Sequence, residues 1–318
     1  MKNRFKYFFL FTIIFIFSYN LLGLYEYGDL VHYRKFYLDI SDVNFFEAFI
    51  MAAFYLDSFE PMYVFIMWIG SLFDIPKDLY VSFFNALLAI SLIKLCELYK
   101  VKWYTILLLL SNFYLLVMYT GAERLKFAYL IMIISLMAKK KYVQNLFYIS
   151  PLAHLQSTIF VAPKIILFLY DTNFKKISGF FRNAFIIIFF FILFYFLKDA
   201  LIAKINNYYN SSWNISQIFQ LSILFLVYWI ITKNFKNSLL IFFPLFLLAF
   251  IIGNERVNMI GFTFITFLLM KSNKLNHPLY IALLIYFAYK SFVFINNIVK
   301  YGDGFIYDHE NLQMLPII

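Results

Sequence analysis

Long apolar runs dominate this sequence and decide which kinds of fold it can form. Nine lie near residues 1–24, 79–98, 103–120, 124–138, 180–197, 217–232, 238–252, 257–270 and 278–298. Apolar residue types make up 64% of the 318 residues and charged types 14%, against about 45–50% and about 25% in a soluble domain. In water this excess would form a large exposed apolar patch, which is unfavourable. A bilayer removes that cost because its interior is itself apolar. The sequence therefore predicts an all-α, polytopic membrane helical bundle, with residues 1–318 as a single integral membrane domain.

The composition also excludes several classes of function. The net charge of +10 does not require nucleic acid as a partner, because membrane proteins collect Lys and Arg in their cytoplasmic loops. Cys96 is the only cysteine, so no intramolecular disulfide and no cysteine-based metal site can form. The four histidines lack the spacing of zinc enzymes, and the absence of a Walker motif argues against ATP-driven transport by this chain alone. We expect no metal and no other cofactor.

Two further segments, residues 44–73 and 142–170, carry polar residues at mid-length. If each enters and leaves the membrane on one side, the basic loops all fall on the side of the N-terminus, where Glu97 and Asp171 are the only acids. The positive-inside rule favours this arrangement, with a cytoplasmic N-terminus. It predicts about nine full spans plus two broken or re-entrant helix pairs. Because non-helical backbone at membrane depth must face protein or a wet cavity, the breaks predict an outward-facing cavity.

The topology places five small polar clusters at the outer face or in this cavity. Their members are Glu26, Asp29, His32, Tyr33, Arg34 and Tyr37; Asp57, Glu60, Pro61 and Tyr63; Glu123, Arg124 and Lys126; His154, Gln156 and Ser157; and Asn254, Glu255, Arg256 and Asn258. Ionisable residues inside a membrane are costly and usually functional.

The dipeptides Glu123-Arg124 and Glu255-Arg256 each lie at the outer mouth of a predicted helical hairpin. A guanidinium offers five donors in a fixed fork that suits phosphate oxygens, and it stays charged. Two such groups facing one cavity would hold a diphosphate without a metal. The alternative is a short loop with a solvated ion pair. Lys126 would neutralise a second phosphate or, alternatively, extend its ammonium to lipid headgroups.

His154 lies in an apolar segment beside Pro151 and suits a general base, because imidazole exchanges its proton near neutral pH. The alternative is a neutral histidine that bonds a carbonyl group at the proline break. Glu60 and Asp29 are the second choices for the base. The Glu60-Pro61 pair also fits an ordinary helix start, because both residue types are favoured there.

In their order and spacing, these clusters resemble the EpsG / Wzy-like family of bacterial polysaccharide polymerases. The resemblance covers about residues 1–270 and rests on short motifs. These are Asp29-Leu-Val-His-Tyr33, Glu60-Pro61-Met62-Tyr63, Arg124-Leu125-Lys126-Phe127-Ala128, Ala153-His154-Leu155-Gln156-Ser157 and the late Arg256. Two positions depart from the family pattern: Leu125 replaces the usual Gln, and Ser157 lies one position late.

The resemblance implies a metal-independent membrane glycosyltransferase in the bacterial cytoplasmic (inner) membrane. It would polymerise polyprenyl-diphosphate-linked oligosaccharide repeat units of an O-antigen, capsule or exopolysaccharide by moving the growing glycan to a hydroxyl of the next unit. The expected catalytic residues are His154, Glu60 and Asp29, and the expected substrate-binding residues are Arg124, Arg256, Glu123, Glu255, Tyr33, Tyr63 and Lys126. The expected partners are the lipid-linked oligosaccharides and membrane lipids, and a chain-length regulator and a flippase are compatible with this function.

Two alternatives remain open. The first is a flippase or transporter of lipid-linked glycans, although such folds often have two related halves and this sequence has no internal repeat. The second is another lipid-linked glycosyltransferase or ligase, or a membrane acyltransferase. A ligase usually has one large outer loop, whereas the outer loops expected in this chain are short.

Overall fold

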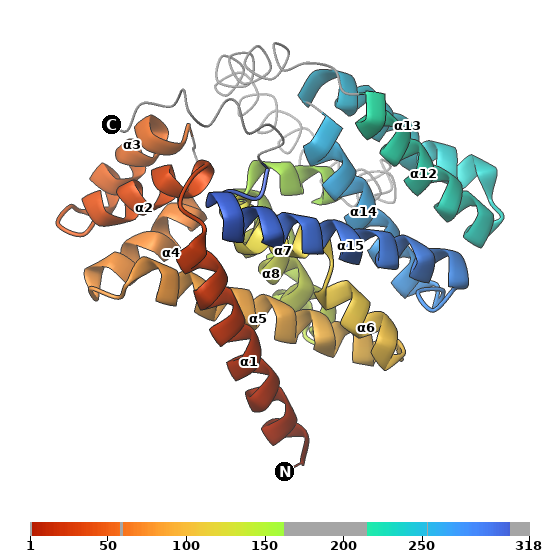
Figure 1. Ribbon diagram of the computed structural model, residues 1–318, viewed down its shortest axis with the longest axis horizontal. Helices are drawn as coiled ribbons and strands as arrows, with labels where there is room; N and C mark the ends of the chain where they lie inside the picture. The colour runs from red at the N-terminus through yellow and green to blue at the C-terminus, as the bar shows by residue number, and fades with distance from the viewer. Residues whose placement is uncertain (1, 58–59, 162–214, 253, 306–318) are drawn as a thin grey trace, which may run out of the picture. The chain divides into compact units, whose positions relative to one another are not determined.

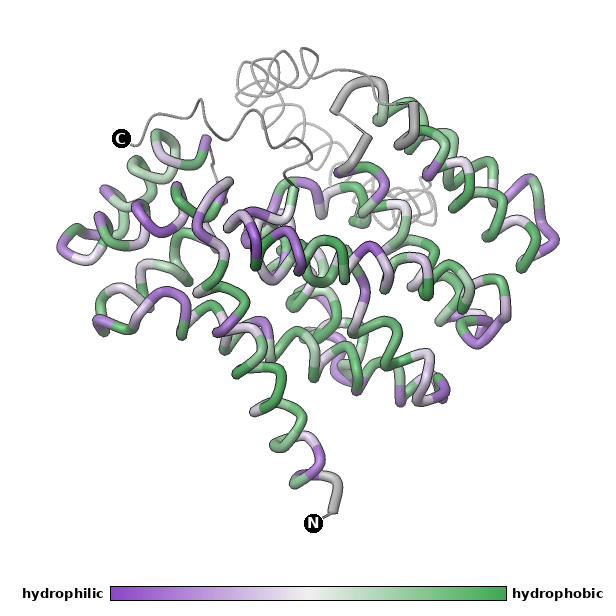
Figure 2. Tube along the Cα trace, in the orientation of Figure 1, coloured by the Kyte–Doolittle hydropathy of each residue, from purple (hydrophilic) through white to green (hydrophobic). Residues whose placement is uncertain are grey.

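The computed structural model describes residues 2–57, 60–161, 215–252 and 254–305 (Figure 1). Every regular element in these ranges is helical, which confirms the all-α prediction for them. The chain divides into two compact units, one of Met1–Ile159 with Ile281–Ile318 and one of Phe160–Tyr280. The single integral domain over residues 1–318 stays a prediction. Hydropathy follows the elements, because apolar residues line the helices and hydrophilic residues gather at the turns (Figure 2).

The first unit contains most of the helices. They are α1 (Lys2–Leu24), α2 (Asp29–Asp39), α3 (Phe45–Leu56), α4 (Pro61–Leu72), α5 (Lys77–Leu98), α6 (Trp103–Leu110), α7 (Phe113–Tyr119), α8 (Glu123–Met137), α9 (Lys141–Gln144), the 3-10 helices η1 (Asn145–Leu152) and η2 (Leu155–Ser157), and α15 (Pro278–Tyr301) from residue 281 onward.

Helices α1 and α5 form an antiparallel pair. Near the N-terminus, Lys6 Nζ lies 2.6 Å from Glu97 Oε1 at the end of α5. At the opposite end, which we call the distal end, Arg34 Nη2 lies 2.8 Å from Asp78 Oδ2 at the start of α5. The helices have 23 and 22 residues, about 33–35 Å at the rise of an α-helix. The segment 25–76 therefore begins and ends at the distal end.

Helices α3 and α4 form the break predicted within residues 44–73, and their axes bend by 111°. The Asn44 side chain caps α3 and exchanges hydrogen bonds with Glu47, as in a capping box. Asp57 ends α3 in the left-handed conformation with φ of 45°. Pro61 starts α4, where its missing N–H costs nothing. These signals explain why the segment is a bent pair and not one straight helix.

The apolar segment 103–120 forms two helices, α6 and α7. Ser111 ends α6, and the Asn112 side chain accepts the backbone N–H of Tyr114 to start α7. Asn competes for backbone hydrogen bonds and therefore favours a new helix start over a helix interior. Neither helix alone has the roughly 20 residues that a straight span requires.

The segment 142–170 is also interrupted, as far as the structure describes it. The short elements α9, η1 and η2 replace a continuous helix, with Pro151 inside η1. A 3-10 helix rises about 2.0 Å per residue against 1.5 Å in an α-helix, so few residues are needed to return from the end of α8. This return brings His154 to Glu60, which also binds Arg124 in the first turn of α8. Residues 162–170 lie outside the described residues.

Three helices of the described part are long and apolar enough to cross a membrane: Arg4–Leu24, Lys77–Leu98 and Pro278–Tyr301. The bent pair of α3 and α4 passes the same test only when its two helices are taken together. Nine full spans and an outward-facing cavity stay predictions, and the expected span at 180–197 lies outside the described residues.

The second unit contains α12 (Ile215–Thr232), α13 (Phe235–Ile252) and α14 (Asn254–Lys271), which pack against one another. Pro244 lies inside α13. Lys274 Nζ, after α14, donates to the Ile231 carbonyl at 3.0 Å and ties the ends of α14 and α12 together. This unit carries the second predicted Glu-Arg dipeptide at the start of α14.

Candidate functional site

Buried charged side chains from distant parts of the sequence meet at the distal end of the first unit. We divide them into the Glu60 cluster, which is Glu60, Arg124 and His154, and the Glu123 cluster, which is Lys77, Glu123 and Lys126. Each of these six residues is less than a tenth exposed. Burying charged groups is expensive unless they are paired and hydrogen-bonded, so the pairing within each cluster decides what it can do.

A single carboxylate holds the Glu60 cluster together. Oε2 of Glu60 accepts a hydrogen bond of 3.0 Å from Arg124 Nη1. Oε1 contacts His154 Nδ1 and accepts the Leu155 backbone N–H at 3.0 Å. Arg124 Nε donates to the Tyr33 hydroxyl at 3.2 Å. The arginine and histidine predicted to carry the chemistry therefore share one acidic partner.

Local backbone structure explains how His154 reaches this carboxylate. His154 is extended, with φ of −160° and ψ of 124°, between η1 and η2. A carboxylate beside Nδ1 favours the tautomer with hydrogen on that atom, which leaves the ring lone pair on Nε2. We assign this tautomer from the hydrogen-bond partners. The arrangement is a carboxylate–imidazole pair of the kind that orients general bases.

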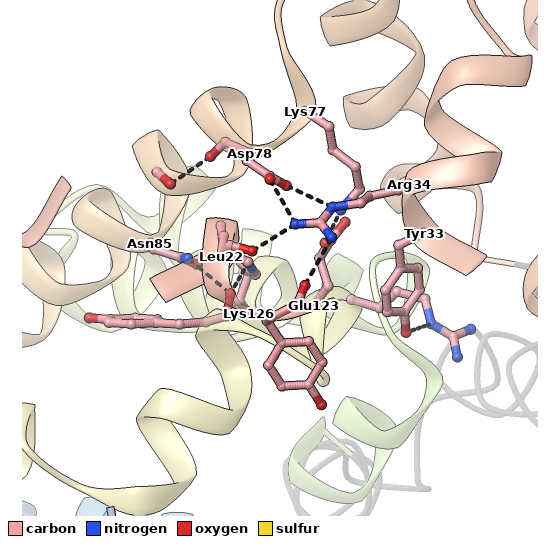
Figure 3. Close-up of polar contacts among 12 residues, drawn as sticks. Leu22, Tyr33, Arg34, Lys77, Asp78, Asn85, Glu123 and Lys126 are labelled. Carbon is pink, nitrogen blue, oxygen red and sulfur yellow. Dashed lines mark hydrogen bonds and ion pairs between the residues drawn. The ribbon is translucent and has the colours of Figure 1, made fainter. Parts of the chain in front are cut away.

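The Glu123 cluster lies where α5 and α8 begin. Lys77 Nζ is 2.6 Å from Glu123 Oε2, and the Tyr63 hydroxyl donates to Oε1 at 2.8 Å. Figure 3 shows Lys77 reaching Glu123 with Lys126 nearby. Lys126 is fully buried, so its ammonium does not extend to headgroups; it donates to the Tyr119 carbonyl at 3.4 Å.

Two tyrosines join the clusters. The Tyr33 and Tyr63 rings meet edge to face with centroids 6.1 Å apart. Arg124 lies 5.9 Å and Lys77 5.7 Å from the centroid of the Tyr33 ring. Tyr63 was predicted to bind substrate. In this structure it is fully buried and its hydroxyl binds Glu123, so it holds the Glu123 carboxylate in place.

Small differences in exposure separate the two clusters. The Arg124 and His154 side chains keep 11% and 10% of their surface exposed, whereas the Glu123 side chain keeps none. Arg124 and His154 are therefore more accessible to a ligand than Glu123, and Lys77 matches Glu60 with 6% of its side chain exposed. Glu123 and Lys126 are the two fully buried members of the Glu123 cluster.

Lys77 was not among the predicted site residues. Its position could have identified it, because a lysine directly before an apolar span on the predicted outer side is an exception to the positive-inside rule. Arg34 was included in a polar cluster, and it binds the carbonyls of Leu22 at 2.7 Å and Tyr25 at 2.9 Å besides Asp78. Figure 3 shows this contact to Leu22, which closes the end of α1.

Other predicted site residues are not part of these clusters. Asp29 is exposed at the first position of α2 and makes no hydrogen bond to either cluster. Arg256 is half-buried near the start of α14 in the second unit. The Glu255 side chain lies outside the part of the chain that the structure describes. The diphosphate clamp of Arg124 and Arg256 therefore stays a prediction.

No group of three or more His, Cys, Asp or Glu side chains among the described residues could hold a metal ion. No family model matches this chain, and no curated protein and no solved structure matches it either. The family resemblance thus rests on the sequence motifs, and the chemistry of the site must be argued from its own residues.

Proposed function

We propose that this chain is a membrane glycosyltransferase that polymerises polyprenyl-diphosphate-linked oligosaccharide repeat units. The observation that carries the proposal is the Glu60 cluster, in which an arginine and a histidine meet one carboxylate inside an apolar helical unit. A guanidinium suits a diphosphate leaving group, and a carboxylate-bound imidazole suits a base for a hydroxyl. These are the two groups that a transfer from a lipid diphosphate requires.

The proposed step forms one bond and breaks one bond. The hydroxyl oxygen of the acceptor unit bonds to the anomeric carbon of the donor glycan, and the bond from that carbon to the diphosphate oxygen breaks. The hydroxyl proton passes to His154, and the bonding electrons leave with the polyprenyl diphosphate. Arg124 stabilises the charge that develops on this leaving group. Arg256 is the second proposed cation for the same diphosphate.

The membrane orientation is part of the proposal. The distal end faces outward from the bacterial cytoplasmic membrane, and the N-terminus is cytoplasmic. Two observations support this. Lys6 pairs with Glu97 at the end of α5. Lys94 lies just before the last turn of α5, and Lys100 and Lys102 follow the helix. Basic residues at one end of paired spans mark the cytoplasmic side.

Deletion of the gene followed by glycan profiling tests the proposal against a flippase. Loss of long chains with single repeat units retained supports a polymerase, whereas loss of both favours a flippase and contradicts the proposal. Wild-type chain should restore elongation and Arg124→Ala should not, at equal protein level in the membrane. Lys300→Ala is the matched control, because Lys300 is an exposed basic residue near the distal end of α15.

A further inference from the structure

Glu60 is shared between two groups with different proposed tasks. Its Oε2 binds Arg124 at 3.0 Å, and its Oε1 binds the imidazole of His154 and the Leu155 N–H. Glu60 itself is 5% exposed, so water competes little for its oxygens. A buried carboxylate interacts strongly with each cationic partner. A ligand that binds one partner therefore changes the strength of the interaction between Glu60 and the other partner.

An anionic ligand at Arg124 has to compete with Glu60. Nε and Nη1 of the guanidinium already donate to Tyr33 and Glu60. A diphosphate that binds through Nη1 therefore competes with Oε2 directly, and one that binds through Nη2 weakens the attraction between Arg124 and Glu60 by neutralising the guanidinium. The carboxylate keeps His154 and the Leu155 N–H as partners, and it holds the protonated imidazole better than before. Leaving-group binding and proton acceptance are thereby coupled.

We propose that Glu60 is a positioning residue that couples diphosphate binding at Arg124 to the proton affinity of His154. This rests on the proposed function and deepens it: the base becomes strong only when the donor diphosphate is in place. By linkage, protonation of His154 in turn favours diphosphate at Arg124. This coupling would keep the proton affinity of His154 low while no donor diphosphate is bound.

The neighbourhood of His154 contains other groups that bear on its proton. The buried charged or titratable residues of the two clusters and of the tyrosines that join them are Tyr33 on α2, Glu60 directly before α4, Tyr63 on α4, Lys77 on α5, and Glu123, Arg124 and Lys126 on α8, and the exposed Tyr148 lies on η1. Of these, Glu60 contacts the imidazole through Nδ1. The remaining groups are unchanged in a Glu60 variant, which makes Glu60 the right position to test.

The test uses the full chain in lipid nanodiscs with inorganic pyrophosphate as the probe. Calorimetry measures pyrophosphate binding, and nuclear magnetic resonance of labelled histidine measures the titration of His154, assigned with His154→Gln. In Glu60→Gln, pyrophosphate should bind about tenfold more tightly, because the competitor is gone. The proton affinity of His154 should fall about tenfold, because its carboxylate is gone. A purely structural role would weaken both properties together.

Wild-type protein provides the second readout. Pyrophosphate should raise the proton affinity of His154, and the rise should fall by more than half in Glu60→Gln, where the shared carboxylate is gone. An equal rise in both proteins, or weaker pyrophosphate binding by a folded Glu60→Gln, overturns the inference. If Glu60→Gln fails to fold, Glu60→Asp replaces it, because its shorter side chain cannot reach both partners. If the protein polymerises glycans but shows no such coupling, only the inference about Glu60 is wrong. If the coupling is present but no polymerisation occurs, only the proposed function is wrong.

Discussion

Lys77 Nζ lies 2.6 Å from Oε2 of Glu123, and both side chains are buried at the point where α5 and α8 begin. The pair joins the first residues of two helices that are 46 positions apart in the chain. It fixes both helix starts at the distal end, next to the Glu60 cluster. Removing one partner of a buried ion pair leaves an uncompensated charge, which costs about 3–5 kcal/mol.

Lys77→Met should therefore lower the free energy of unfolding by about that amount. Adding Glu123→Gln should recover part of it, because the unpaired carboxylate is gone and the amide oxygen still accepts from the Tyr63 hydroxyl. The recovery stays partial because the buried Lys126 loses the acid of its own cluster. Denaturant unfolding of the purified protein in detergent measures the cycle. Lys300→Met is the control and should change little. Additive effects of the two substitutions would show that the pair is not coupled.

Gly70 on α4 provides a test of packing next to the site. A Cβ atom at this position would lie 2.6 Å from both the Tyr37 hydroxyl oxygen and Tyr80 Cε1, so Gly70→Ala should destabilise the protein by about 1–3 kcal/mol. Gly23 on α1 is the matched control, because nothing lies within 4 Å of its Cβ position. Gly23→Ala should be neutral or stabilising by up to about 1 kcal/mol. Equal thermal unfolding temperatures for both variants would contradict the packing of α4.

Cysteine labelling tests the predicted topology. In a Cys96→Ser background, a cysteine at Lys140 should react from the same side of the membrane as one at Arg4. A cysteine at Lys300 should react from the opposite side, because the Gly302 carbonyl after α15 accepts the backbone N–H of Glu26 at the distal end. Membrane-impermeant reagents on oriented vesicles measure this. Labelling of residue 140 from the side of residue 300 would rule out the topology.

The sequence was most informative about the long helices. Continuous apolar runs predicted 79–98 and 278–298, and the structure has α5 and α15 there. The polar residues and proline of 57–61 predicted the break between α3 and α4, because local signals specify helix ends. The division of 103–120 was missed, since its signal is only the Ser111-Asn112 pair inside an otherwise apolar run.

The candidate site was predictable as a set of residues but not as a set of contacts. Glu60 and His154 were predicted as polar residues within apolar segments, and Arg124 was predicted at the outer mouth of a helical hairpin. That Glu60 bridges the other two depends on packing between residues 64 and 94 positions apart, for which a single sequence carries no local signal. Glu60 was assigned as an alternative base, whereas its contacts fit a residue that positions the arginine and the histidine.

Arg124→Lys should reduce chain elongation about 100-fold or more while the protein still inserts in the membrane. Lysine keeps the charge and three donors, but its compact ammonium lacks the planar fork that places Nε at Tyr33 and Nη1 at Glu60. Glycan chain length at matched protein level measures the effect. Normal chain length in both Arg124→Lys and Arg124→Ala would remove this arginine from the proposed chemistry.

Reconstitution of the purified chain tests the central proposal most directly. Proteoliposomes would contain the protein and one polyprenyl-diphosphate-linked oligosaccharide, without nucleotide or added metal. We predict a ladder of lipid-linked glycans that grows by whole repeat units, with one polyprenyl diphosphate released for each new bond, and no ladder with Arg124→Ala. Folded wild-type protein that moves the lipid-linked oligosaccharide across the bilayer but forms no ladder would contradict the proposal and identify a transporter.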